Sequence, residues 1–72
     1  MSNTNFIKIK LNDATEKVAA DSSLQALIRH FKEADPDLIV ELNGRFVYPR
    51  AYSATIVQQG DRLEFINPNF GG

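Results

Sequence analysis

Apolar and polar residues alternate near the start of the chain, over residues 6–11. The positions on one side are Ile7, Ile9 and Leu11, and those on the other are Lys8 and Lys10. A period of two is typical of a β-strand with one buried face, so both lysines are expected to face solvent. A turn pair follows at residues 12–13 and lets residues 14–19 return as a second strand, which predicts a β-hairpin.

A helical repeat follows, in which apolar positions recur at intervals of three and four. These positions are Leu24, Leu27, Ile28 and Phe31. Ser22 and Gln25 stand three residues apart and fit a capping box, so the helix is expected to begin there. Pro36 disfavours further helical turns, which limits the predicted helix to about ten to twelve residues.

Alternation resumes at residues 38–42 and ends at an Asn-Gly pair. The positions on one face are Leu38, Val40 and Leu42. Asn43-Gly44 between two apolar runs is a strong hairpin signal, and it predicts a fourth strand over residues 45–48. A third strand therefore turns directly into a fourth.

The segment before the last predicted strand is irregular. Pro49 ends the fourth strand, and residues 50–57 are expected to contain one helical turn, anchored by Tyr52 and Ile56. A final strand is predicted at residues 62–66. Its inward residues are expected to be Leu63 and Phe65.

The predicted element order is β-β-α-β-β-β. One helix of this length covers about four or five strands, so the order favours an α+β, ubiquitin-like β-grasp, with one main helix across a mixed four- to five-stranded sheet. A chain of 72 residues holds one compact core. We therefore expect a single domain over residues 1–72, in which residues 67–72 form a flexible C-terminal tail.

Composition excludes several kinds of function. The chain has no cysteine, which removes disulfides, cysteine–zinc sites and thiol catalysis. Its net charge of −1 gives no field that would capture nucleic acid or an anionic membrane. No signal peptide or membrane-length apolar run is present, so we expect a cytoplasmic protein. His30 has no companions at metal-ligand spacing, so no metal site and no bound cofactor are expected.

The chain ends in Gly71-Gly72, the slimmest peptide that the amino acids allow. Launched from a rigid final strand, the six residues from Asn67 reach at most roughly 20 Å. This tail suits delivery of the Gly72 carboxylate into another protein's active site, with Gly71, Phe70 and Asn69 inserted beside it. A loose chain end is the alternative, and Phe70 either folds back onto the domain or docks on the partner.

A candidate partner surface lies on the sheet face expected to point away from the helix. It consists of Phe6, Ile39, Phe46 and Ile66. Exposed apolar patches mark partner surfaces. The alternative is that one or two of these residues complete the core.

Several segments together resemble the ThiS/MoaD family of ubiquitin-like sulfur-carrier proteins. They are Leu42-Asn43-Gly44, Pro49-Arg50, Gly60-Asp61-Arg62-Leu63-Glu64 and the terminal Gly71-Gly72. The resemblance spans the whole chain, and the Asn-Gly and Pro-Arg pairs are more similar to the thiamine-pathway branch than to the molybdopterin branch.

The resemblance implies that the chain is a protein co-substrate with no catalytic residues of its own. A partner that resembles the ThiF and MoeB adenylyltransferases, using ATP and Mg²⁺, would adenylate Gly72. A sulfur donor such as a cysteine desulfurase would convert the adenylate to a thiocarboxylate, and a thiazole synthase-like enzyme would accept the sulfur. Sulfur delivery to molybdopterin or amino-acid biosynthesis, a ubiquitin-like modifier joined through Gly72, and an interaction module with an inert tail remain alternatives.

Overall fold

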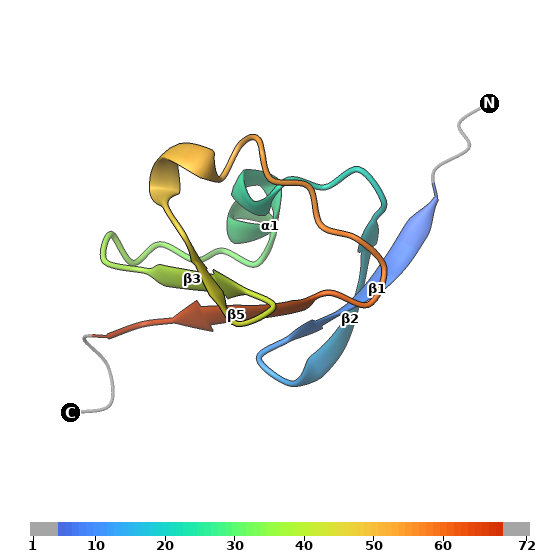
Figure 1. Cartoon of the computed structure of the whole chain (residues 1–72), viewed down its shortest axis with the longest axis horizontal. Coiled ribbons are helices and arrows are strands. Elements are labelled where there is room, and N and C mark those ends of the chain that lie inside the picture. Colours follow the sequence, from blue (N-terminus) through green and yellow to red (C-terminus); the bar gives the residue numbers. More distant parts are fainter. Residues whose placement is uncertain (1–4, 69–72) are drawn as a thin grey trace.

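The structure, a computed structural model, describes residues 5–68 as a five-stranded mixed sheet with one helix packed on one face (Figure 1). The elements in chain order are β1 (Phe6–Leu11), β2 (Ala14–Ala19), α1 (Leu24–His30), β3 (Ile39–Leu42), β4 (Arg45–Val47), the 3₁₀ turn η1 (Pro49–Ala51) and β5 (Arg62–Ile66). The predicted α+β architecture is confirmed. Of the strands, β3 begins one residue later than predicted and β4 ends one residue earlier.

The last strand lies inside the sheet, whose order is β2-β1-β5-β3-β4. Strand β5 pairs parallel with β1 and antiparallel with β3. The β1–β2 and β3–β4 pairs are antiparallel hairpins. Strand β5 is therefore the element that joins the two hairpins.

Both hairpin turns are built on positive φ angles. The φ values are 48° at Asn12, 71° at Asp13, 53° at Asn43 and 82° at Gly44. Two-residue turns with positive φ at both positions match the twist of the strands that they connect. Asparagine, aspartate and glycine adopt these angles most readily, so both predicted hairpins are confirmed.

Helix α1 begins one residue later than the sequence indicated. Its N-cap is Ser23, whose Oγ accepts a hydrogen bond from the N–H of Ala26 at 3.0 Å. The Ser22 hydroxyl instead donates to the carbonyl of Ala19 at 2.8 Å. The predicted capping box of Ser22 and Gln25 is therefore wrong, because the cap falls on the second of two adjacent serines.

Helix α1 also ends earlier than predicted, after seven residues. Lys32 takes a positive φ of 59°. Its N–H donates to the carbonyl of Arg29 at 3.1 Å, and the N–H of Glu33 donates to the carbonyl of Ile28 at 3.0 Å. This pair of bonds is a Schellman ending, so Lys32 rather than Pro36 terminates the helix. Among the described residues, no helix is long and apolar enough to span a membrane.

The core lies between the sheet and a layer formed by α1 and the segment that links β4 to β5 (Figure 1). Its buried side chains are Ile9, Val18, Leu24, Leu27, Val40, Tyr52, Val57, Leu63 and Phe65. Burial of each large aliphatic side chain contributes about 1.5–3 kcal/mol. The predicted inward faces of the strands and of the helix are confirmed, and Lys8 and Lys10 are exposed as expected.

The irregular segment corrects one predicted anchor. Tyr52 is buried as predicted, but Ile56 is 42% exposed and Val57 is fully buried in its place. The N–H of Val57 donates to the carbonyl of Ser22 at 3.0 Å, which ties the segment to the start of α1. This contact is long-range and leaves no periodic signal in the sequence.

Candidate functional site

An exposed apolar surface lies on the sheet face opposite α1, over β3, β4 and β5. Ile39 is directly opposite Ile66. Phe46 is opposite Glu41, which follows the buried Val40 and therefore points to the face away from the core. Phe46 is 49% exposed and Ile66 is 37% exposed. Three of the four predicted surface residues therefore gather here. Together with Tyr48 we name them the apolar surface: Ile39, Phe46, Tyr48 and Ile66.

Tyr48 is absent from the surface predicted from the sequence. It packs edge to face on Phe46, with ring centroids 4.7 Å apart. Its position two residues after Phe46 is the signal that identifies it, because strand alternation places both rings on one face. The Arg50 guanidinium lies 4.8 Å from the centroid of the Tyr48 ring. Aromatic residues and arginine are enriched at protein interfaces.

Phe6 does not belong to this surface. Strand β1 runs parallel to β5 with Lys10 opposite Arg62, so Phe6 lies before the start of β5 whereas Ile66 lies at its end. At the usual rise per residue the two are roughly 25 Å apart along the sheet. Figure 1 shows the first residues of β1 and the last residues of β5 at opposite ends of the molecule.

Two pairs of like charges lie on the same sheet face. Lys8 of β1 is directly opposite Lys17 of β2. Glu41 of β3 is directly opposite Glu64 of β5. Like charges in such positions destabilise a sheet by about 0.2–1 kcal/mol. The face therefore has a basic half over β1 and β2 and an acidic pair beside the apolar surface.

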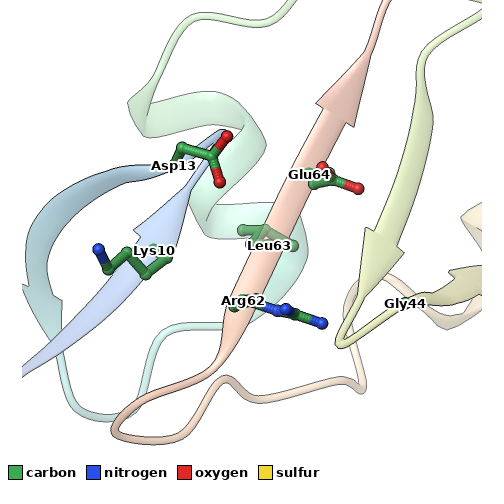
Figure 2. Close-up of a pocket in the computed structure, with 6 residues that line it drawn as sticks. All are labelled: Lys10, Asp13, Gly44, Arg62, Leu63 and Glu64. Carbon is green, nitrogen blue, oxygen red and sulfur yellow. The ribbon is translucent and has the colours of Figure 1, made fainter.

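A hollow of about 160 Å³ lies between the basic and acidic parts of this face. Figure 2 shows its lining residues: Lys10, Asp13, Gly44, Arg62, Leu63 and Glu64. The side chain of Arg62 extends toward the turn at Gly44, whereas Lys10 points away from Arg62 (Figure 2). Pockets for small molecules measure about 300–1,000 Å³, so this hollow is smaller than a typical cofactor site.

Two asparagine side chains fix β5 from either side. Asn12 Oδ1 accepts a hydrogen bond from the N–H of Phe65 at 2.9 Å, and Asn12 Nδ2 donates to the Phe65 carbonyl at 3.2 Å. Asn43 Oδ1 accepts from the N–H of Arg62 at 2.9 Å, and Asn43 Nδ2 donates to Asp61 at 3.0 Å. The sequence identifies both asparagines as turn residues only, because these partners are far away along the chain.

Asn67 continues this anchoring beyond the end of β5. With its amide nitrogen turned toward the loop after α1, it donates to Asp35 Oδ2 at 3.0 Å and to Glu33 Oε1 at 3.3 Å. The predicted tail begins at Asn67. The anchored part of the chain therefore extends through Asn67, next to Pro68.

The remaining predicted tail residues lie outside the described part of the chain. They are Asn69, Phe70, Gly71 and Gly72. Their predicted insertion into a partner, and the role of the Gly72 carboxylate, therefore remain predictions.

Residues 5–68 offer little acid–base or metal chemistry of their own. No group of three or more histidine, aspartate or glutamate side chains within this range is arranged to hold a metal ion. Burial raises the pKa of the Tyr52 hydroxyl, which keeps that group neutral inside the core. His30 packs edge to face on Phe31, with ring centroids 4.8 Å apart. The prominent features of the site are thus a surface and an anchored strand end.

A mixed sheet crossed by one helix, with the last strand in its middle, defines a ubiquitin-like β-grasp protein. The chain matches the ThiS family over residues 3–72, and it belongs to that family. The predicted resemblance to ThiS/MoaD carriers is confirmed in its ThiS branch.

A solved structure supports this assignment. The chain is similar to the crystal structure of the thiamine biosynthesis protein ThiS from Geobacter metallireducens, with 30% sequence identity and a TM-score of 0.80. The similarity covers 92% of this chain and 100% of that chain. A comparison with curated proteins found no match.

Proposed function

We propose that this chain is a sulfur-carrier protein that delivers sulfur from Gly72 to thiazole synthesis in thiamine biosynthesis. Membership of the ThiS family supports the carrier role. The similarity to a thiamine biosynthesis protein supports the pathway. The structural observation that carries the proposal is the central position of β5, fixed by Asn12 and Asn43, since it gives the tail a rigid base.

In the proposed reaction the chain is a co-substrate. A carboxylate is a poor electrophile, so the Gly72 carboxylate attacks the α-phosphorus of ATP and pyrophosphate leaves. The terminal sulfur of a persulfide on a donor such as a cysteine desulfurase then attacks the acyl-adenylate carbonyl, and AMP leaves as an acyl disulfide forms. A thiol reduces the S–S bond of this acyl disulfide, which releases the thiocarboxylate on Gly72. ATP and Mg²⁺ belong to the activating enzyme, and this chain contributes the acyl group and the surface that positions it.

Three kinds of partner follow from this proposal. They are an adenylyltransferase that resembles ThiF or MoeB, a sulfur donor and a thiazole synthase-like acceptor. We assign recognition of the adenylyltransferase to the apolar surface, because β5 carries both Ile66 and the chain that leads to the tail. Docking at Ile66 leaves the following residues to enter the active site of the enzyme.

Intact-mass spectrometry tests the carrier role. The chain is purified from cells that contain the activating enzyme and are grown under sulfur demand. Part of the protein should carry one terminal oxygen replaced by sulfur, and deletion of Gly71 and Gly72 should abolish this species. A uniformly unmodified C-terminus in these cells would contradict the proposal. Conjugates that survive denaturation and thiol reagents would instead indicate a ubiquitin-like modifier.

A matched pair of substitutions tests the apolar surface. Phe46 and Phe6 are 49% and 55% exposed at opposite ends of the molecule. Phe46→Ser should raise the KM for the carrier in the adenylation assay about tenfold or more, as expected for an aromatic residue central to an interface. Phe6→Ser should leave this KM unchanged. Equal effects of the two substitutions would exclude the apolar surface as the recognition site.

A further inference from the structure

A second apolar feature lies at the opposite edge of the sheet, between β2 and α1. It is a groove of about 340 Å³. Its lining residues are Phe6, Lys17, Val18, Ala19, Ser22, Ala26, Leu27 and His30. Val18 and Leu27 are buried and form its floor. The groove is open because Ala19, Ser22 and Ala26 are small and leave space between the strand and the helix.

Strand β2 is an edge strand, so one side of its backbone has no neighbouring strand. In β1, the N–H of Lys10 donates to Asp61 at 2.9 Å and the N–H of Lys8 donates to Gln59 at 3.0 Å. These groups therefore point toward β5. In an antiparallel ladder, pairs of opposed residues alternate between hydrogen-bonded and non-hydrogen-bonded pairs. Lys8 and Lys17 form a non-hydrogen-bonded pair, so the N–H and carbonyl of Lys17 point toward the open edge.

The outer side of this edge is basic. Lys8 and Lys17 are directly opposite each other. Neither is paired with a carboxylate of residues 5–68. The Lys17 ammonium lies 4.9 Å from the centroid of the Phe6 ring, which holds it at the rim of the groove. An acidic side chain placed across from Lys17 would therefore relieve a repulsion that the fold itself leaves uncompensated.

We propose that the β2 edge and this groove bind an extended segment of a partner protein in which apolar and acidic residues alternate. Such a segment adds a strand beside β2. Its residue opposite Lys17 faces the outer side of the sheet and is acidic. The neighbouring residue opposite Val18 faces the helix, where it is apolar and contacts Val18, Ala26 and Leu27. The neighbour on the other side of the acid lies opposite Glu16, outside the groove.

Charge argues against a second copy of this chain as the occupant. Antiparallel pairing of β2 with β2 of another copy would bring two Lys17 side chains to the same edge and add like charge to the Lys8–Lys17 pair. The proposed segment therefore belongs to a different protein. The groove lies at the β2 edge, and strands β1 and β5 separate β2 from β3 and β4, so its occupation leaves the apolar surface free. The inference does not depend on the proposed sulfur carriage.

The test uses the full chain and a labelled peptide in which valine and glutamate alternate. The expected result is saturable binding by fluorescence anisotropy, with slower hydrogen exchange of the Lys17 amide. Lys17→Glu should weaken binding about threefold to tenfold, through loss of attraction and gain of repulsion. Ala26→Phe should abolish binding by filling the groove. A peptide that alternates valine with lysine should not bind.

Two matched variants serve as controls. Arg45→Glu makes the same change of charge on β4, at the other edge of the sheet, and Arg29→Phe places the same ring on an exposed helix position outside the groove. Both should bind the glutamate peptide as the wild-type chain does. The proposal is overturned if the wild-type chain does not bind this peptide, if the lysine peptide binds equally, or if Arg45→Glu weakens binding as much as Lys17→Glu. Self-association through β2 would overturn it as well.

Discussion

The side chain of Asn12 makes two hydrogen bonds with the backbone of Phe65. Asn12 Oδ1 accepts from the N–H of Phe65 at 2.9 Å, and Asn12 Nδ2 donates to the Phe65 carbonyl at 3.2 Å. Asn12 thereby continues the β1 ladder onto β5 beyond the last residue of β1. Asn12→Gly keeps the positive φ at low strain but removes both bonds, so it should lower the free energy of unfolding by about 1–3 kcal/mol. Urea denaturation measures this change.

Asp13 supplies the control for that prediction. It also has a positive φ, of 71°, and it is exposed. Asp13→Gly removes a side chain from the same turn without removing a bond to β5. Its effect on the midpoint of unfolding should be clearly smaller. A similar loss in both variants would show that the turn, and not the bonds to Phe65, accounts for the effect.

Asn67 provides a pH-dependent prediction. Asn67→Asp replaces an amide that donates to Asp35 and Glu33 by a third carboxylate. The variant should be destabilised by about 1 kcal/mol or more at neutral pH. The two neighbouring charges raise the pKa of the introduced carboxylate above its unfolded value, so the penalty should shrink as the pH falls from neutral toward about 4. Asn67→Ala, which adds no charge, should lack this recovery.

The Glu41–Glu64 pair predicts a substitution that stabilises the protein. Glu64→Gln removes like charge from directly opposite positions, so thermal unfolding should show a gain of about 0.2–1 kcal/mol. The gain should be lost in about 1 M salt, where the screening length is about 3 Å. A gain that persists in salt would mean that packing rather than repulsion is responsible.

Tyr52 predicts a loss of stability at high pH. Burial raises the pKa of its hydroxyl above the usual value of 10.0. Above about pH 10 the unfolded chain releases this proton while the folded chain retains it, so the free energy of unfolding falls as the pH rises. Tyr52→Phe should flatten this decline in equilibrium denaturation between neutral and alkaline pH. Tyr48→Phe, at an exposed position, is the matched control and should retain it.

The position of the helix cap can be tested in the same way. Ser23→Ala should lower the free energy of unfolding by about 1 kcal/mol, because the N–H of Ala26 loses its acceptor. Ser23→Asp should retain most of the stability, since a carboxylate accepts the same bond and is favourable at a helix N-terminus. A Ser23→Ala variant with the same free energy of unfolding as the wild-type chain would contradict the assigned cap.

Local sequence signals were sufficient to predict the strands and both hairpins. The Asn43-Gly44 pair and the alternation on either side of it act within a few residues, so the sequence contains all the information that they need. The end of α1 was harder to predict, because a left-handed lysine at residue 32 carries no compositional signal. The burial of Val57 in place of Ile56 likewise depends on a hydrogen bond to a distant residue, Ser22.

The sequence predicts only part of the candidate site, because only the local part of the information is present in it. Strand alternation correctly placed Ile39, Phe46 and Ile66 on the exposed face. It also placed Phe6 there, but the distance of Phe6 from the others depends on the register between β1 and β5, which are separated by most of the chain. Alternation gives the face of a sheet, and only the pairing of distant strands gives the position along it.

The central place of β5 also bears on how the protein is made. The two hairpins do not pair with each other and are held together through residues 62–66. During translation, both hairpins leave the ribosome before the strand that unites them, so the nascent chain cannot complete its sheet until these late residues emerge. A polypeptide whose synthesis stops before residue 62 would expose unpaired strand edges, making it a substrate for chaperones and proteases rather than a competitor for the partners of the intact protein.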